Sequence, residues 1–266
     1  MTLTEFRNEF NIFYNSIDSN VAPSVNDYEL SVFLTEAQKQ LIVGLYNGNV
    51  NQESFETVEE QKRYLSKLNV RKVLDFTNTE TREKMGFDSS DTELKKELSI
   101  PKSLLLEGIT HEYQPLQDYL FITLESCDLK DDDLCGGEII DVEVLPTKQE
   151  FYHRMKKNPF RGPSSNKIIR LDYFDKINLI SKYKISKYKV NFLRNPNPII
   201  ISDLDGEDSE FDGLGLSIEG KTKASNCELE PSLHRTLVQL AAKLAQQTYM
   251  GNMQIVQQNK KNSGEN

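Results

Sequence analysis

Apolar side chains recur every three or four residues in two stretches near the ends of the chain, the spacing that places them on one face of an α-helix. In TLTEFRNEFNIFYNSI this face consists of Leu3, Phe6, Phe10, Phe13, Tyr14 and Ile17. Thr2 and Glu5 match a capping box at its start. In PSLHRTLVQLAAKLAQQTY, where Pro231 suits a first turn, the face consists of Leu233, Leu237, Leu240 and Leu244. The alanines beside this second stripe would let another helix approach closely.

Two further helices are predicted between these stretches. The segment LTEAQKQLIVGLYNG, from Leu34 to Gly48, has the capping pair Thr35 and Gln38 at its start and Asn47-Gly48 as its stop. Its apolar stripe consists of Leu41, Ile42 and Leu45. The segment SFETVEEQKRYLSKLNVRKVL, residues 54–74, predicts the other helix, with a buried face made of Val58, Tyr64, Leu65 and Leu68. The polar residues 77–98 predict an exposed loop or linker with one short helix.

From Ile100 onward the apolar period shifts towards two, which is typical of β-strands. YLFITLESC and EIIDVEVLP predict neighbouring strands, the second with Ile140, Val142 and Val144 on one face. KIIRLDYF, KINLIS and KYKISKYKVNFL predict three more. Between these two groups, TKQEFYHRMKKNP predicts a helix with the capping pair Thr147 and Glu150.

These elements predict an α+β subunit in which the N-terminal helices pack with the C-terminal helix and a β-rich insertion lies between them. The expected divisions are a helical region (1–76), a polar linker or loop (77–99), a β-rich region with one short helix (100–202), an acidic loop (203–230), a C-terminal helix packing on the helical region (231–250) and a polar tail (251–266). We expect that tail to be frayed or ordered only by a partner.

The composition is that of a globular protein: 266 residues with 37% hydrophobic and 9% aromatic content and a mean hydropathy of -0.56. No apolar run reaches the roughly 18 residues that would span a membrane, and the N-terminus lacks the pattern of a signal peptide. We therefore expect a soluble protein made in a cytoplasm. Cys127, Cys135 and Cys227 have no paired spacing, so we interpret them as free thiols.

Charge is distributed unevenly along the chain, whose formal net charge is -9. The segment from Phe151 to Arg194 contains twelve basic and two acidic residues, a formal charge of +10. The rest of the chain contains 20 basic and 39 acidic residues, a formal charge of -19. The basic segment could contact nucleic acid, dock on an acidic protein surface, or meet the acidic part of a second copy. A solvated sheet face is the plain alternative. We rank self-association first and nucleic acid second.

No recognised catalytic motif is present. There is no phosphate-binding loop and no Gly-x-Ser-x-Gly, and Gly213, Gly215 and Gly220 do not form a dinucleotide fingerprint. The three histidines are scattered along the sequence, and we expect His234 to be exposed or at an edge. A nucleophilic Cys/His pair that comes together only in the folded chain is left as an open alternative. The acidic clusters at 131–133 and 203–212 are interpreted as solvated loops, with calcium as the lesser alternative. We expect no enzymatic activity, no cofactor and no metal.

The order of five phrases resembles a known family. DYELSVFLTEAQKQLIVGLYNG, YLSKL, KKNPFRGP, NFLRNPNPIII and CELEPSLHRTLVQLAAKLA together resemble the structural ring proteins of crAss-like bacteriophages. These proteins form stacked rings in the head-to-tail connector and tail barrel of short-tailed virions. The resemblance covers most of the chain.

The resemblance implies a non-enzymatic virion component that is assembled in the host cytoplasm and forms a ring of identical copies. We expect a dodecamer matching the portal, contacts with the portal protein or a neighbouring ring and tail proteins, a channel through which DNA passes, and no membrane contact. The alternative function is a nucleic-acid-binding module using residues 151–194. The expected partner interface consists of Leu41, Ile42, Leu45, Leu233, Leu237, Leu240, Leu244, Arg154, Lys156, Lys157, Arg161, Lys182, Lys184 and Lys187.

Overall fold

The computed structural model divides the chain into two compact units, one helical and one built on a β-sheet. The first unit comprises Met1–Lys67 with Pro196–Asn266, and the second comprises Leu68–Asn195. The structure describes residues 1–15, 24–47, 63–87, 93–107, 119–131, 137–156, 158, 160–205, 211 and 214–262, the last thirteen by their backbone alone. The β-rich part is thus an insertion in the helical chain, which confirms the predicted α+β class.

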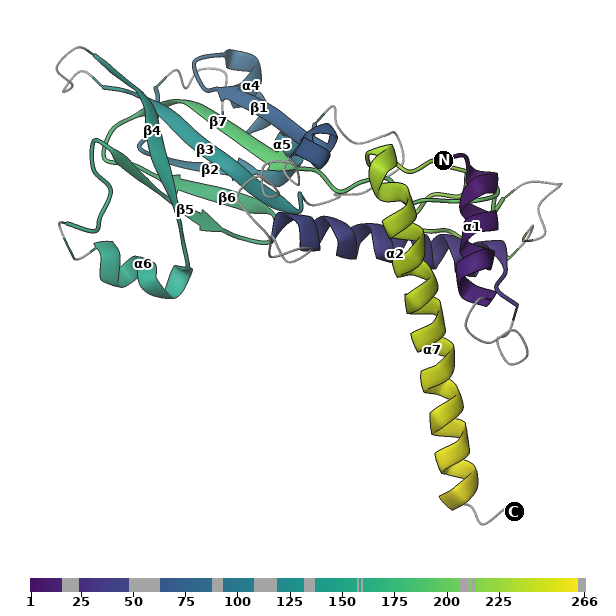
Figure 1. The fold of residues 1–266 in the computed structure, drawn as a ribbon. Helices are drawn as coiled ribbons and strands as arrows, with labels where there is room; N and C mark the ends of the chain where they lie inside the picture. Colours follow the sequence, from purple (N-terminus) through teal and green to yellow (C-terminus); the bar gives the residue numbers. More distant parts are fainter. Residues whose placement is uncertain are drawn as a thin grey trace. The chain divides into compact units, whose positions relative to one another are not determined.

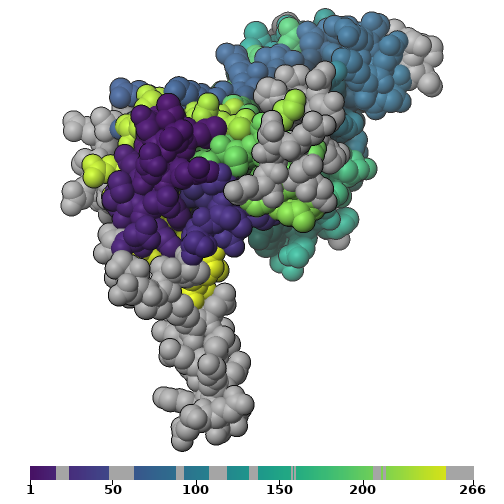
Figure 2. Space-filling view, turned by 90° about the vertical axis from the view of Figure 1, so that its right-hand side faces the viewer, coloured from purple at the N-terminus to yellow at the C-terminus, as the bar shows by residue number. Residues whose placement is uncertain are grey.

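The described part of the helical unit contains the helices α1 (Leu3–Asn15), α2 (Asp27–Tyr46) and α7 (His234–Asn262), the last preceded by the 3-10 turn η2 (Pro231–Leu233). Helix α7 packs against both α1 and α2. In Figure 1 it is the long yellow helix, and Figure 2 shows α1 in purple with yellow atoms of α7 visible beside it. The predicted packing of N-terminal helices with the C-terminal helix is confirmed.

Helix α1 begins as the sequence predicts. The backbone N–H of Glu5 donates to Thr2 Oγ1 at 3.3 Å, and the N–H of Thr2 donates to Glu5 Oε2 at 2.8 Å. Phe6, Phe10 and Tyr14 are its buried side chains. One face of the helix therefore supplies three aromatic rings to the core of the helical unit.

Helix α2 starts earlier than the capping pair Thr35 and Gln38 predicts. The observed N-cap is Asn26, whose side chain accepts from the N–H of Glu29 at 2.8 Å while Glu29 Oε2 accepts from the N–H of Asn26 at 3.1 Å. Thr35 and Gln38 lie inside the helix and are buried. The start predicted at residue 34 is wrong because the apolar stripe continues N-terminally through buried leucines at residues 30 and 34. The predicted end is confirmed by the C-cap Asn47.

The buried face of α7 is rotated relative to the predicted leucine stripe. Leu240 and Leu244 are only half-buried. The fully buried line consists of Leu237, Val238, Ala241, Ala242 and Ala245. Small side chains at the closest approach allow α1 and α2 to come near the α7 backbone, which leaves the larger leucines at the edge of the contact. The helical backbone also continues beyond the expected end at residue 250.

Seven strands form one sheet in the second unit. They are β1 (Asn69–Asp75), β2 (Glu97–Pro101), β3 (Phe121–Lys130), β4 (Glu138–Thr147), β5 (Lys167–Asp172), β6 (Lys176–Ile180) and β7 (Ile185–Leu193). Their order is β1-β7-β3-β4-β5-β6-β2. Among the described strands only β4 and β5 pair in parallel, and they are joined through α6 (Gln149–Lys156). All five predicted strands are confirmed, while Thr147, expected to cap the intervening helix, is the last residue of β4.

The core of the sheet unit lies on one face of the sheet. Side chains from all seven strands and from the short helix α5 (Lys102–Leu106) form a single cluster, whose fully buried members include Ile100, Leu105, Cys127, Leu129, Ile168 and Tyr188. Because alternate residues of a strand point to opposite faces, the other face carries charged side chains such as Asp128 and Lys189 together with apolar ones such as Leu124 and Ile169.

The helix predicted over residues 54–74 is wrong at its end, because Asn69–Asp75 is strand β1. It pairs antiparallel with β7 along its whole length, from Asn69 opposite Leu193 to Asp75 opposite Lys187. Val70 and Val73 suit a strand, and cross-strand pairing overrides the helical spacing of the leucines before them. Of the predicted buried face, Leu65 and Leu68 are buried, and Val58 lies outside the described residues. The short helix predicted within 77–98 is confirmed as α4 (Thr79–Lys84).

A β-bulge in β4 overturns the predicted alternation of that strand. Cys127 of β3 pairs with Val142, but Leu129 pairs with Ile139, so β4 contains one extra residue there. Asp141 takes a positive φ of 55°, as expected where a strand carries an extra residue. Val142 is buried while Ile140 is 63% exposed. The prediction that both share one face with Val144 is therefore wrong.

Candidate functional site

The predicted interface residues of the helical unit lie mostly inside that unit. Leu41, Ile42 and Leu45 of α2 are at most 4% exposed, and Leu237 of α7 is fully buried. Leu233 is also buried, while Leu240 and Leu244 are half-buried. These side chains stabilise the helical bundle, and the half-buried pair forms the part of the stripe nearest to solvent.

Two hydroxyl groups of α2 accept hydrogen bonds from the backbone of residues 199 and 201, which lie far from this helix in the sequence. Thr35 Oγ1 accepts from the N–H of Ile199 at 3.1 Å, and Ser31 Oγ accepts from the N–H of Ile201 at 2.9 Å. All of these residues are buried. Side chains of α2 thus accept the hydrogen bonds that these two backbone N–H groups would otherwise donate to a neighbouring strand. Thr35, interpreted as a cap from its spacing, has this role instead.

His234 is buried rather than exposed or at an edge, so that prediction is wrong. Its ring lies 5.1 Å from that of Phe6, and its Nε2 faces the carbonyl oxygen of Leu229 at 3.1 Å. The N-terminal nitrogen of Met1 lies 3.0 Å from its Nδ1. Burial lowers the pKa of His234. Both ring nitrogens are therefore occupied, and the imidazole has no free nitrogen to activate a nucleophile.

The described cysteines are free thiols of low reactivity. Cys127 is buried in the sheet core, and burial raises its pKa well above that of an ordinary thiol. Burial also raises the pKa of Cys227 to about 11. Because the thiolate is the nucleophile, neither group is activated at neutral pH. Cys135 lies outside the described residues.

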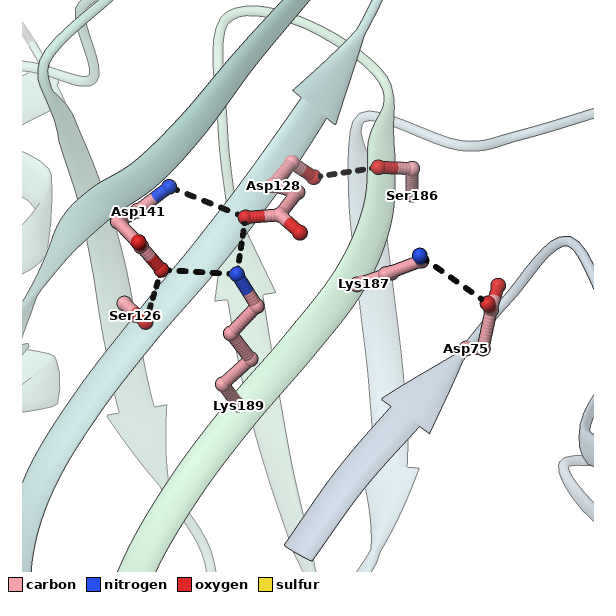
Figure 3. A network of polar contacts seen from close by, with 7 residues as sticks. All are labelled: Asp75, Ser126, Asp128, Asp141, Ser186, Lys187 and Lys189. Carbon is pink, nitrogen blue, oxygen red and sulfur yellow. Dashed lines mark hydrogen bonds and ion pairs between the residues drawn. The ribbon is translucent and has the colours of Figure 1, made fainter.

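Part of the basic segment pairs with acids of neighbouring strands, as Figure 3 shows for Lys187 and Lys189. Lys189 Nζ on β7 lies 2.8 Å from both Asp128 of β3 and Asp141 of β4. Lys187 lies 3.6 Å from Asp75 of β1. The hydrogen bond from Lys189 lowers the pKa of Asp141, and those to Asp128 and Asp141 raise the pKa of Lys189. This network also fixes the bulge, because Asp128 Oδ1 accepts from the N–H of Asp141 at 3.0 Å.

One ion pair of the segment is almost fully buried. Arg170 of β5 pairs with Glu125 of β3, and their side chains are only 11% and 7% exposed. Tyr188 Oη donates to the other oxygen of the same carboxylate at 2.8 Å. Burial lowers the pKa of Arg170, but its attraction to Glu125 more than offsets this and leaves the pKa raised. Register between strands β3, β5 and β7 creates this cluster, and no local sequence signal indicates it.

The basic residues of the predicted interface lie in or just after α6, in the β6–β7 turn and, for Lys187, in β7. Arg154, Lys156 and Arg161 are exposed, as is Lys182, while Lys184 and Lys187 are half-buried. Lys157 lies outside the described residues. The three arginines and lysines in and after α6 make no ion pair with any residue that the structure describes.

The acidic clusters offer no cation site in the described part of the chain, where no group of three or more His, Cys, Asp or Glu side chains could hold a metal ion. Asp131 instead accepts from the N–H of Lys184 at 3.4 Å, and Asp203 accepts from the N–H of Ala224 at 2.6 Å. Most of the other predicted acids lie outside the described residues. Among the residues that the structure describes, no helix is both long and apolar enough to cross a membrane.

Together these features define a structural subunit, whose conspicuous apolar and charged side chains serve helix packing and strand pairing. Comparison with known proteins agrees. The family model described as "Phage tail ring protein 3/4" matches residues 1–256. The chain belongs to this family of crAss-like phage tail ring proteins, so it is a virion structural protein and not an enzyme.

Two relatives come from Bacteroides phage crAss001. "Ring protein 3" is 37% identical over 248 residues, which cover 92% of this chain and 95% of the relative. "Ring protein 4/5" is 28% identical over 261 residues, 96% of each. The likeness extends over both units. The resemblance inferred from the five phrases is confirmed, and membership of a ring protein family implies association with further copies and with other tail proteins.

Proposed function

We propose that the chain assembles into a closed ring in the tail of a short-tailed virion, stacked on the portal or on an adjacent ring and surrounding a channel for DNA. The observation that carries this proposal is the family match over residues 1–256. A dodecamer would match the symmetry of the portal, and a head-to-tail contact between two different surfaces of the subunit would close such a ring. The connector position and the role in DNA ejection belong to the same proposal.

The overall charge suits a channel component. A formal net charge of -9 makes a wall of such subunits repel the phosphates of DNA at short range. DNA would then slide through without specific binding. The basic residues that carry the opposite sign are partly paired within the chain, as Lys189 is with Asp128 and Asp141.

That pairing also weighs against the alternative function, a nucleic-acid-binding module. A phosphate-binding surface needs cations free to replace the counterions of the nucleic acid. Arg170, Lys187 and Lys189 already have carboxylate partners within the sheet unit. We therefore favour assembly over nucleic-acid recognition.

The predicted interface leucines take two roles in this proposal. Leu41, Ile42, Leu45 and Leu237 keep the bundle rigid from inside, since they are buried. Leu240 and Leu244, half-buried at the edge of the α7 stripe, remain candidates for contact with the portal or a neighbouring ring. Both leucines lie on helix α7, whose backbone continues to Asn262.

Mass photometry and negative-stain electron microscopy of the purified protein test the ring, alone and mixed with its portal and neighbouring tail proteins. We expect closed rings whose population grows with protein concentration. Monomers at every concentration and salt level, with all partners present, would overturn the proposal. Titration with double-stranded DNA tests the alternative: binding that weakens steeply with salt and is lost on combined charge reversal at Lys182, Lys184 and Lys187 would favour nucleic-acid recognition.

A further inference from the structure

Strand β1 lies at one edge of the seven-stranded sheet, with a hydrogen-bonded neighbour strand on one side only. Proteins commonly blunt such edges with short strands, prolines or bulges, because an open edge pairs readily with another extended chain. The opposite edge strand, β2, has five residues and ends at Pro101, which has no N–H to donate. Strand β1 has seven residues without proline or glycine and pairs with β7 without a register shift. Of the two edges, β1 is therefore the better template for a further strand.

The hydrogen bonds at the two ends of the β1–β7 ladder show which backbone groups of β1 face the open edge. At one end the N–H of Arg194 donates to the C=O of Leu68 at 3.0 Å. At the other end the N–H of Phe76 donates to the C=O of Ser186 at 2.9 Å. Hydrogen-bonded and non-hydrogen-bonded residue pairs alternate along an antiparallel ladder. Residues 70, 72 and 74 therefore bond to β7, whereas residues 69, 71, 73 and 75 turn their N–H and C=O groups away from it.

Three of these edge-facing residues, Asn69, Arg71 and Val73, are exposed, and Val73 has an exposed fraction of 48%. In the fourth, Asp75, the C=O already accepts from the N–H of Asn78 at 3.3 Å. Among the described residues, no backbone hydrogen bond reaches the N–H or C=O of the three exposed residues. We call the backbone groups of residues 69, 71 and 73 the β1 edge. It presents N–H donors and C=O acceptors in alternation.

We propose that an extended segment of a second copy pairs with the β1 edge and adds a strand to the sheet, which makes a contact between neighbouring copies of the ring. This inference rests on the proposed ring. Main-chain hydrogen bonds to the three edge residues would supply the affinity, and the exposed side chain of Val73 would pack against the added strand. The edge and the segment that pairs with it are two different surfaces, so the contact can repeat around a ring.

The chemistry of the β1 edge selects a polypeptide as the occupant. An extended backbone offers N–H and C=O groups at the spacing of the edge, which neither a nucleic acid nor a lipid surface supplies. Charge leaves the edge accessible, because Lys72 donates to the C=O of Glu107 and only Arg71 among the three edge residues is charged. Membership of a ring protein family implies association with further copies, so we assign the added strand to a second copy.

Proline substitutions distinguish the edge from the sheet itself. V73P removes an N–H that faces the edge, a position where a strand tolerates proline. The sheet unit should stay folded, while assembly should require at least about tenfold more protein than for the wild type. K72P removes an N–H that bonds to β7, so it should destabilise the sheet unit in urea denaturation.

S99P is the matched control on the other edge. Ser99 is exposed, and its backbone faces away from β6, because the neighbouring hydrogen-bonded pairs include Lys96 with Ser181 and Lys102 with Asp175. The variant thus carries the same kind of change at an edge that the contact does not use, and it should assemble like the wild type.

Hydrogen exchange of the wild type, measured at single residues, provides a test that needs no substitution. At protein concentrations too low for assembly, the amides of Arg71 and Val73 should exchange rapidly. Those of Lys72 and Leu74 should exchange slowly, because they bond to β7. In assembled rings the amides of Arg71 and Val73 should become protected as well.

The outcomes separate this contact from the ring itself. If the wild type stays monomeric with all tail partners present, the proposed ring fails. If rings form but the amides of Arg71 and Val73 exchange as fast as in the monomer, or if V73P assembles like the wild type, the ring stands and the β1 contact is overturned. Protection of these amides already in the monomer, or only after another tail protein is added, would show a different occupant and also overturn it. A V73P variant as unstable as K72P would contradict the assignment of the edge-facing groups.

Discussion

The buried ion pair between Arg170 and Glu125 yields a sharp stability prediction. The two side chains are 11% and 7% exposed, and Glu125 also accepts a hydrogen bond from Tyr188. Replacing Arg170 by Met removes the cation but leaves the carboxylate in the core of the sheet unit. An uncompensated buried charge of this kind costs roughly 3–5 kcal/mol.

The triple variant E125M/R170M/Y188F should recover most of that loss. It removes both charges and the hydroxyl that would otherwise lose its acceptor, and a buried ion pair replaced by apolar groups of similar volume is often neutral or stabilising. K187M is the matched control. It removes one cation of the same sheet, but the Lys187–Asp75 pair is 40% and 38% exposed, so its loss should cost less than about 1 kcal/mol.

Urea denaturation followed by circular dichroism measures these free energies of unfolding. Hydrogen exchange of β3, β5 and β7 assigns the change to the sheet unit, because one unfolding transition need not report on a single unit of a two-unit chain. The reasoning is refuted if R170M is as stable as K187M. A triple variant less stable than R170M would refute it as well.

Three further predictions concern the helical unit. Burial lowers the pKa of His234 from about 6.5 in the unfolded chain, so its contribution to stability is complete above that pH and is lost as the pH falls below it. Replacement of His234 by Gln should therefore flatten the dependence of Tm on pH between pH 7.5 and pH 5, about the window where unperturbed histidine titrates. An equally steep dependence in the variant would contradict this prediction. Thr35→Val keeps the shape but leaves the buried N–H of Ile199 without an acceptor, which should cost roughly 1–3 kcal/mol in urea denaturation; a neutral effect would show that another group takes the bond. Leu237→Ala at a fully buried site should cost about 2–5 kcal/mol, while Leu214→Ala at a site 65% exposed should be close to neutral in the same assay.

Local signals in the sequence were sufficient where a single element decides its own structure. Thr2 and Glu5 form the predicted capping box because both partners lie within one helical turn. The strands β3 to β7 were predicted from β-branched and aromatic residues, whose preference for a half-buried pleated surface is already visible in short segments. The five phrases that indicated the family likewise depend only on order along the chain.

Local signals failed where a residue's partner is distant in the sequence. Thr35 and Gln38 have the spacing of a capping box, but Thr35 bonds to Ile199, far along the chain. Residues 69–75 continue a helical spacing, yet pairing with β7 makes them a strand. The predicted leucine stripe of α7 was displaced because the alanines, not the largest side chains, mark the closest approach of helices.

For this protein the sequence by itself determined the helices at both ends, most of the strands, the class of fold and the family. Only the tertiary structure decided what the charges and the apolar residues do. Strand register pairs Lys189 with Asp128 and Asp141, and one extra residue in β4 turns Ile140 outward. The physical reason is that capping and periodicity act within a few residues, whereas ion pairs, register and burial depend on segments that only folding brings together.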